Sequence, residues 1–278
     1  MIDEPTFRAD LYRGTAADYD RYRLPYPPRL IDELCAEVGA DGRGRLLDLA
    51  CGPGTATFAL CDRFAEVVAV DLEPEAVAFA ADKADRLGVT NVRWLAGRAE
   101  DVDANERFDV ITIGTAFHRL DRPRIAAQAA GWLRPAGHLA LLWSSTPMEG
   151  AAPWQRELAA IVVDWMAELD ATDRLPAQLE EHLAEHPHAR VVEDAGFEVL
   201  GRHEVTDAHV WSVDDLVGFS CSTSLLSRAV LGERLPDFER DVRDRLHAVE
   251  PSGLFREDAT FACDLFSAGG SRPPLRGR

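Results

Sequence analysis

Residues 48–55 (DLACGPGT) have the composition of a loop that binds a nucleotide-like ligand. The loop follows an apolar run at residues 45–50 and precedes residues 55–63, which we expect to be helical. Small residues let the backbone approach a ligand closely, and a helix N-terminus offers free N–H donors. Asp71 lies seventeen residues past Gly54, at the end of a second apolar run, where a carboxylate can accept hydrogen bonds from ribose hydroxyls.

Two other nucleotide motifs fit this loop less well. A dinucleotide fingerprint requires Gly-x-Gly-x-x-Gly, and Thr57 stands at the position of the third glycine. That fingerprint also does not usually carry an acid inside the preceding strand, as Asp48 is here. A P-loop is excluded because no Gly-Lys-Ser/Thr follows the glycines. A nicotinamide-dependent reductase is therefore the weakest of the readings considered.

The loop resembles that of the class I S-adenosylmethionine-dependent methyltransferases, in their small-molecule branch. The family's loop has the form Asp-x-Gly-x-Gly-x-Gly or a near variant. This chain matches it at Asp48, Gly52 and Gly54, and Ala50 replaces the first glycine. The resemblance implies S-adenosylmethionine as cofactor and S-adenosylhomocysteine as product.

Further segments extend the resemblance in the family's order. Asp71 in VVAVDLEPE resembles the family's ribose-binding acid, with Leu72 beside the adenine. Residues 97–101 (GRAED) resemble the family's adenine-binding segment, with Ala99 and Glu100 as the matching residues. Residues 108–123 and 134–140 resemble the fourth strand and the turn into the fifth. The N-terminal segment YDRYRLPYP also resembles a segment of this branch, which implies that Arg23 contacts the carboxylate of the cofactor's methionine half. The implied cofactor-binding residues are Tyr19, Arg23, Asp48, Ala50, Gly52, Gly54, Asp71, Leu72, Ala99, Glu100 and Thr115.

Apolar runs alternate with helical stretches through the first 145 residues. The expected strands are 45–50, 67–70, 92–95, 108–113 and 138–143, and the expected helices are 29–38, 55–63, 75–87 and 122–133. Near-continuous apolar strands that alternate with helices predict a doubly wound α/β domain, whose parallel sheet is covered on both faces. The resemblance implies a mostly parallel, seven-stranded Rossmann-like sheet with an antiparallel last strand.

The pattern changes after residue 145. Residues 153–167 and 175–185 are expected to form a helical lid insertion, and 212–228 and 236–249 two further helices. A long strand at 197–211 can pair as a hairpin with a last strand at 259–266. We therefore divide the chain into a cofactor-binding core with an N-terminal helical cover (1–145), a lid and C-terminal strands that complete the acceptor pocket (146–268), and a disordered tail (269–278).

His118 is the candidate catalytic base, because it follows the fourth expected strand and an imidazole titrates near neutrality. The alternative is that His118 only orients the substrate or packs against the cofactor. Candidate substrate contacts are Trp143, Trp211, Ser222 and Ser224. The spacing of His182, His186 and His188 could suit a metal, but no further ligand is evident, so we expect solvated lid residues and no metal site.

The 278-residue chain carries 48 acidic and 30 basic residues, a net charge of −18. Such a field repels phosphate backbones and anionic lipid, so we expect no nucleic-acid or membrane partner. Residues 151–250 hold 21 acids and 9 bases, which favours a cationic acceptor slightly. Five cysteines without a Cys-x-x-Cys pair, and no apolar run long enough to span a membrane, favour a cytoplasmic location.

These observations predict S-adenosylmethionine-dependent methyl transfer to a small molecule, with a secondary metabolite as the expected acceptor. An amine such as that of an amino sugar is slightly preferred over a hydroxyl as acceptor. The alternative is a member of the fold that binds the cofactor without transferring methyl, as a cyclase, an isomerase or a regulatory subunit. The oligomeric state is open between monomer and homodimer.

Overall fold

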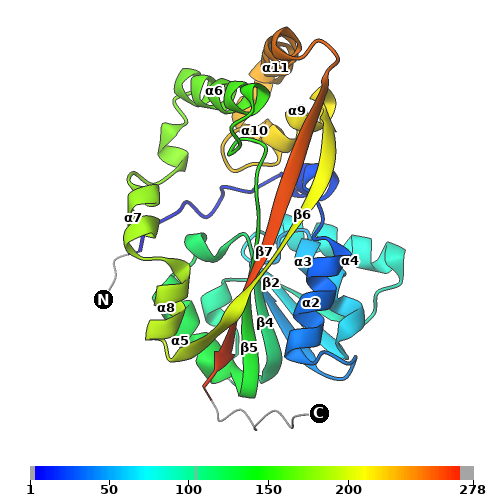
Figure 1. The fold of residues 1–278 in the computed structure, drawn as a ribbon, viewed down its shortest axis with the longest axis vertical. Coiled ribbons are helices and arrows are strands. Elements are labelled where there is room, and N and C mark those ends of the chain that lie inside the picture. The colour runs from blue at the N-terminus through cyan, green and yellow to red at the C-terminus, as the bar shows by residue number, and fades with distance from the viewer. Residues whose placement is uncertain (1–3, 104, 270–278) are drawn as a thin grey trace.

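The computed structural model describes residues 4–103 and 105–269. Seven strands form one sheet in the order β3-β2-β1-β4-β5-β7-β6 (Figure 1). They are β1 (Arg45–Leu49), β2 (Glu66–Asp71), β3 (Val92–Ala96), β4 (Phe108–Gly114), β5 (Leu133–Ser144), β6 (Phe197–Ser212) and β7 (Leu254–Ala268). The first five strands are parallel, and β7 runs antiparallel to both β5 and β6. The expected α/β fold with an antiparallel last strand is confirmed.

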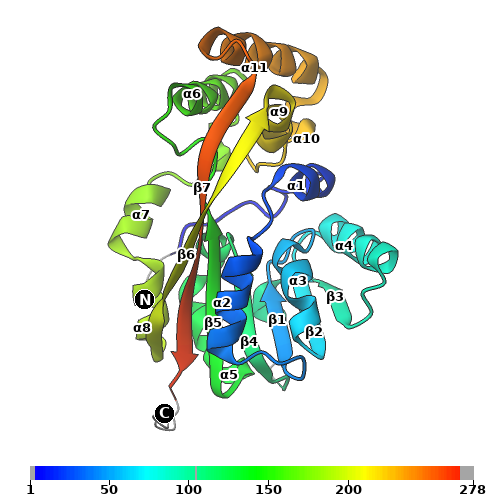
Figure 2. The same ribbon diagram turned by 45° about the vertical axis from the view of Figure 1, so that its right-hand side comes forward.

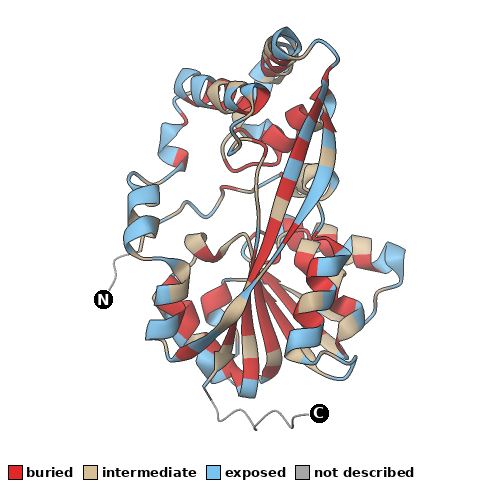
Figure 3. Ribbon diagram, in the orientation of Figure 1, coloured by how far each residue is buried: buried red, intermediate tan, exposed pale blue. Residues whose placement is uncertain are grey.

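The central strands are apolar because both faces of the sheet are covered. Leu46 and Leu47 are neighbours in β1 with opposite orientation, and both are fully buried. On the side of Leu46 lie α2 (Pro28–Val38) and α3 (Thr55–Leu60). On the side of Leu47 lie α5 (Arg122–Trp132) and α8 (His188–Asp194). The buried strands in Figure 3 form the core between these two layers.

A second group of helices forms a cap at the far end of the β6–β7 ribbon (Figures 1 and 2). It consists of α6 (Pro153–Glu168), α9 (Val213–Cys221), α10 (Arg228–Leu231) and α11 (Leu235–Val249). The cap has its own apolar core, in which Trp165, Phe238 and Leu246 pack against Phe255 from β7. The ribbon therefore belongs to both the sheet and the cap.

Several elements differ from their expected bounds: β5 begins at Leu133 instead of 138, and the helix expected at 175–185 begins at Leu179. The helix expected at 212–228 ends at Cys221. Directly after it, the hydroxyls of Ser222 and Thr223 donate to the carbonyls of Phe219 and Ser220 and so compete with continued helical hydrogen bonding. Strand β7 begins at Leu254, five residues before the expected 259. Buried and exposed residues alternate at its start, but the polar Glu257 occupies one of the buried positions. The sequence therefore does not show the alternation of apolar and polar residues that is typical of a strand.

The remaining α-helices lie in the N-terminal segment, between β2 and β3, and between α6 and α8. They are α1 (Ala16–Tyr22), α4 (Pro74–Leu87) and α7 (Leu179–Glu185). The expected disordered tail lies outside the described residues from 270 onward. Within the described ranges, no helix has the length and apolar character to cross a membrane.

Candidate functional site

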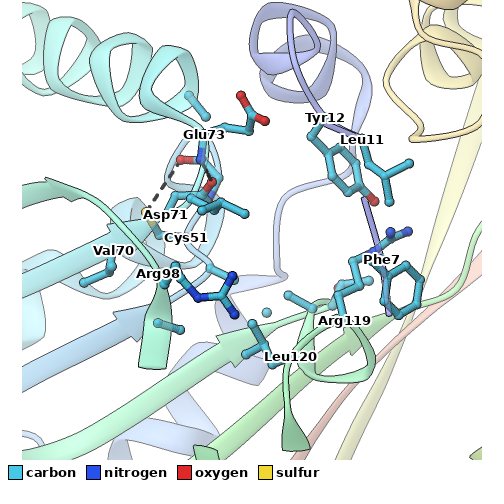
Figure 4. Close-up of a pocket in the computed structure, with 18 of the residues that line it drawn as sticks. Phe7, Leu11, Tyr12, Cys51, Val70, Asp71, Glu73, Arg98, Arg119 and Leu120 are labelled. Atoms are coloured by element: carbon cyan, nitrogen blue, oxygen red, sulfur yellow. Dashed lines mark hydrogen bonds between the residues drawn. The ribbon is translucent and has the colours of Figure 1, made fainter. Parts of the chain in front are cut away.

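A cavity of about 740 Å³ opens at the carboxyl ends of β1, β2 and β4. Its walls come from the N-terminal segment 4–16, the loop after β1, the end of β2, residues 98–100 and the segment after β4. Figure 4 shows Asp71 and Cys51 on one side of it and Phe7, Tyr12 and Arg119 on the other. The cofactor residues expected from the sequence that line it are Tyr19, Asp48, Ala50, Gly52, Asp71, Leu72, Ala99, Glu100 and Thr115.

The loop after β1 adopts left-handed backbone angles at Ala50 (φ 54°), Gly52 (φ 54°) and Gly54 (φ 91°). A Cβ on Gly52 would meet no atom within 4 Å. Because Gly52 lines the cavity, such a Cβ would stand at the edge of the ligand space. Gly54 is outside the lining and has a packing role, since its Cβ would lie 2.7 Å from the Phe58 ring.

The Asp71 carboxylate is held by two backbone donors. Its Oδ2 accepts a hydrogen bond from Gly52 N at 2.7 Å, and its Oδ1 accepts one from Glu73 N at 2.8 Å. Burial raises the pKa of Asp71, against the lowering effect of these two bonds. Each oxygen keeps a further lone pair for a ligand donor, so the side chain fits a pair of ribose hydroxyls.

Asp48 lies fully buried beneath the loop, at the cavity floor. Its carboxylate accepts hydrogen bonds from the Thr57 and Thr112 hydroxyls, the second at 2.9 Å. Burial raises its pKa to about 6, while the two hydroxyls act in the opposite direction. Asp48 thus joins β1 to α3 and β4 and fixes the loop from below.

Residues 98–100 form the wall beyond Asp71. Ala99 and Glu100 are buried, and Arg98 forms a 3.4 Å ion pair with Glu100. Leu72 is 42% exposed, so this cavity-lining side chain offers an apolar surface to a ligand. Leu72 and Ala99 both line the cavity, so each can offer apolar surface to the face of an adenine ring.

The end of β4 forms the floor on the other side. Thr115 has a left-handed backbone (φ 51°), and its hydroxyl lies 3.3 Å from the Tyr26 hydroxyl. Tyr26 also restricts Gly114, whose Cβ would lie 2.9 Å from the Tyr26 oxygen. Burial raises the pKa of Tyr26, so its phenol stays protonated and can donate a hydrogen bond.

His118, the candidate base, is outside the cavity lining, although its neighbour Arg119 is part of it. The imidazole contacts the Phe7 ring edge to face at 6.2 Å between centroids. Burial, followed by the charge of Arg119, lowers its pKa to about 3. The imidazole is therefore neutral near pH 7 and a weak base.

Arg23 also lies outside the lining. Its Nε donates to the Ser222 hydroxyl at 2.9 Å, and its guanidinium lies over the Tyr19 and Phe219 rings. Arg23 therefore ties the N-terminal helix α1 to α9 of the cap.

The four candidate substrate contacts are also absent from the lining. Trp143 is 37% exposed on β5, beneath the Arg202 guanidinium. Trp211 is buried in the cap core and donates from Nε1 to Glu257 at 2.6 Å. Ser222 and Ser224 are buried and bond Arg23 and Arg119. The sequence could not show this, because each position depends on how the cap packs.

The lid histidines are not simply solvated. His182 Nε2 and His188 Nδ1 lie 2.9 and 3.1 Å from the guanidinium of Arg122, which is fully buried. Arg122 also donates to the Glu4 carboxylate at 2.7 and 3.1 Å. This cluster anchors the start of the N-terminal segment beside the cavity. Within the described chain, no group of three His, Cys, Asp or Glu residues could hold a metal ion.

The N-terminal wall is the part that sequence reasoning missed. Phe7, Tyr12 and Arg119 line the cavity, and both rings contact the Arg119 guanidinium. Arg119 directly follows His118, so its place after the fourth strand was the available signal. Nothing in residues 4–15 indicates by periodicity that this segment crosses the cavity.

The fold and this cavity define a class of proteins that bind a nucleoside cofactor at the carboxyl end of a doubly wound sheet. The profile of the "Methyltransferase domain" family matches residues 46–137. An uncharacterized methyltransferase of Mycobacterium tuberculosis is 33% identical over 145 residues, which are 52% of this chain and 55% of the relative. A trans-aconitate 2-methyltransferase of a Mycobacterium species is 30% identical over 187 residues, 64% of this chain and 69% of that relative.

A solved structure described as a type II methyltransferase, from Anaeromyxobacter dehalogenans, has the same fold, with a TM-score of 0.59 and 24% identity. It aligns with 88% of this chain over 97% of its own. The chain belongs to the class I S-adenosylmethionine-dependent methyltransferases. The match to the M. tuberculosis methyltransferase spans only about half of that relative.

The site fits the family's cofactor, S-adenosylmethionine. The open space above Gly52, the free lone pairs of Asp71 and the apolar surface of Leu72 are what a methionine chain, a ribose and an adenine require. When bound, the cofactor supplies an electrophilic sulfonium methyl group.

Proposed function

We propose that this chain transfers a methyl group from S-adenosylmethionine to a small-molecule acceptor enclosed in the cavity. The observation that carries the proposal is that one cavity joins the cofactor loop and Asp71 to a second wall of Phe7, Tyr12 and Arg119. Its 740 Å³ lies within the ~300–1,000 Å³ typical of small-molecule sites.

In this proposal the chain acts mainly by positioning. Asp71 and the backbone of Gly52 hold the nucleoside, while Thr115 and Tyr26 form the floor where the acceptor approaches. The N-terminal segment covers the site and keeps water away from it. Alignment and exclusion of water are the principal requirements of an in-line displacement.

The base role of His118 remains a prediction with a clear test. General base catalysis typically contributes ~10²–10⁴-fold to rate. If His118 removes a proton, His118→Asn should lower the rate of methyl transfer by that amount. The position of His118 behind Phe7 and its low pKa favour a packing role, with a smaller loss that does not depend on pH.

The slight preference for an amine acceptor cannot rest on the net charge of residues 151–250. No residue of the acid-rich stretch 151–250 lines the cavity. Several of its carboxylates form ion pairs within the cap, such as Glu157 with Arg245 and Glu168 with Arg234. Amine and hydroxyl acceptors, including secondary metabolites, stay within the proposal. The trans-aconitate methyltransferase relative adds a carboxylic acid as a third class.

The remaining proposals concern the setting of the enzyme. The five cysteines are buried free thiols, which fits a reducing cytoplasm. We propose a monomer or homodimer whose only partner is the small acceptor.

The experiment supplies S-adenosylmethionine with a labelled methyl group and an acceptor panel of amines, alcohols and carboxylic acids. Enzyme-dependent label in one acceptor class supports methyl transfer and names the class. Binding of S-adenosylhomocysteine without transfer to any acceptor would favour a fold member that does not methylate. Failure of the wild type to bind S-adenosylhomocysteine would overturn the cofactor site itself.

A further inference from the structure

We infer that Arg119 is the anion-recognition residue of the site and that it takes a carboxylate of the acceptor. This inference rests on the proposed function, because it names the chemistry of the acceptor in the same cavity. It is carried by the hydrogen bonds of the Arg119 guanidinium, by its ring contacts and by the state of the other arginines in the wall.

The Arg119 guanidinium has donors to spare. Its Nη2 donates to the Ser224 hydroxyl at 3.1 Å. Its Nε and Nη1 are shielded from solvent and have no hydrogen-bond partner among the described residues. No carboxylate of a described residue lies within ion-pair distance of it. Shielded N–H donors without a hydrogen-bond partner are costly, so a ligand that satisfies these donors of the half-buried Arg119 is favoured.

The other arginines that line the cavity differ from Arg119. Each of them has a carboxylate partner and is about half exposed to solvent. They are Arg8 with Asp10, Arg98 with Glu100 and Arg124 with Asp101. Their charges are already compensated and screened by water. Arg119 is thus the cation in the described wall that is free to bind a ligand anion.

Two rings hold the guanidinium in place. Its central carbon lies 5.1 Å from the centroid of Phe7 and 4.9 Å from that of Tyr12. Cation–π contacts of this kind fix the plane of the group and do not use its N–H donors. The N-terminal segment that carries both rings is anchored by Glu4 on the buried Arg122. The donors are therefore preorganised before a ligand arrives.

The surroundings favour a carboxylate over a phosphate. A guanidinium binds either group through two parallel hydrogen bonds. The same cavity, however, contains the carboxylates of Asp48, Asp71, Glu73 and Asp121. A singly charged acid meets less repulsion from these groups than a doubly charged phosphate ester.

Figure 4 places Arg119 across the cavity from Asp71. An acid held by Arg119 therefore lies away from the position that fits the ribose. The affinity of Arg119→Gln for S-adenosylhomocysteine then distinguishes an acceptor acid from the cofactor's own carboxylate.

The test uses calorimetric titration of the full chain loaded with S-adenosylhomocysteine. The probes are the singly charged acids phenylacetate and propionate, their amides phenylacetamide and propionamide, and phenyl phosphate. We expect at least one acid to bind the wild-type complex tenfold or more tightly than its amide. Arg119→Gln should abolish this preference and change the affinity for S-adenosylhomocysteine less than twofold. Arg119→Lys keeps the charge but loses the planar pair of N–H donors, so it should retain part of the preference for the acid over its amide.

Arg86→Gln, on the exposed side of α4 and outside the cavity, is the matched control and should behave as wild type. Thermal unfolding of each variant shows whether it is folded. Equal binding of acids and amides by the wild type, or an acid preference that survives in Arg119→Gln, would overturn the inference. So would tighter binding of phenyl phosphate than of either acid. A tenfold loss of S-adenosylhomocysteine affinity in Arg119→Gln would assign the residue to the cofactor instead.

These outcomes are separate from failure of the proposed function. If the wild type does not bind S-adenosylhomocysteine at all, the cofactor site is wrong and Arg119 is not the cause. If it binds S-adenosylhomocysteine but no acid in preference to its amide, the cofactor site stands and only the inference about Arg119 falls.

Discussion

The backbone N–H of Gly52 donates to Oδ2 of Asp71 across 2.7 Å, which joins the loop after β1 to the end of β2. The two segments belong to neighbouring parallel strands, whose register pairs Leu49 with Val70. The bond therefore fixes the position of the carboxylate relative to the loop before any ligand binds. Preorganisation of this kind lowers the cost of ordering the site on binding.

Asp71→Ala should weaken S-adenosylhomocysteine binding by ~10–100-fold, because hydrogen bonds to a charged group contribute about 1.5–3 kcal/mol. Asp71→Asn should lose less, since an amide oxygen still accepts. Calorimetric titration measures both. Asp85→Ala, on the exposed face of α4, is the control. Unchanged affinity in Asp71→Ala would show that this carboxylate does not bind the ribose.

Gly52→Ala and Gly88→Ala separate backbone strain from ligand contact. Both glycines have positive φ, 54° and 70°, and at both a Cβ would meet no protein atom within 4 Å. We expect each substitution to lower the free energy of unfolding by about 1–2 kcal/mol. Only Gly52 lines the cavity, so only Gly52→Ala should also weaken S-adenosylhomocysteine binding. Equal affinities in the two variants would argue against close approach of the cofactor there.

Two half-buried histidines should make the protein sensitive to acid. Burial lowers the pKa of His118 to about 3 and that of His188 to about 4, compared with ~6.5 in the unfolded chain. Below pH 6.5 the unfolded state therefore binds protons that the folded state does not. The free energy of unfolding should fall as the pH decreases from about 6.5 toward 4.

Urea unfolding at pH 7.5, 6 and 5 measures this dependence. His118→Asn should flatten it, whereas His247→Asn, at an exposed position on α11, should not. A pH dependence of the same steepness in wild type and His118→Asn would show that His118 is not the source.

Trp211→Phe should affect stability and leave ligand binding intact. The substitution removes the Nε1 donor of the buried Glu257, whose other hydrogen-bond donor, Gln155 Nε2, lies at 3.5 Å. We expect a loss of about 1–3 kcal/mol in the free energy of unfolding. Trp143→Phe, at a half-exposed site, should change it by roughly 0.5 kcal/mol or less. If Trp211→Phe instead weakens acceptor binding at unchanged stability, Trp211 contacts the substrate as the sequence suggested.

The sequence by itself determined the core and the cofactor loop of this protein. Apolar strands such as 67–70 are short, continuous and bounded by turns, so their burial follows from local composition. Gly52 and Gly54 can adopt positive φ because glycine has no Cβ, so the residue type alone indicates a tight turn there. Asp71 could be assigned because it follows directly on a strand whose end must lie at the ligand edge of the sheet.

Only the tertiary structure decided the acceptor side. Phe7 and Arg119 are far apart in the chain, and their contact depends on the path of an N-terminal segment without periodic pattern. Trp211 and Ser222 are of types that suit a binding site, yet the packing of the cap directs them to Glu257 and Arg23. A residue type limits which contacts a side chain can make, but long-range packing chooses among them, and that choice determines the acceptor chemistry.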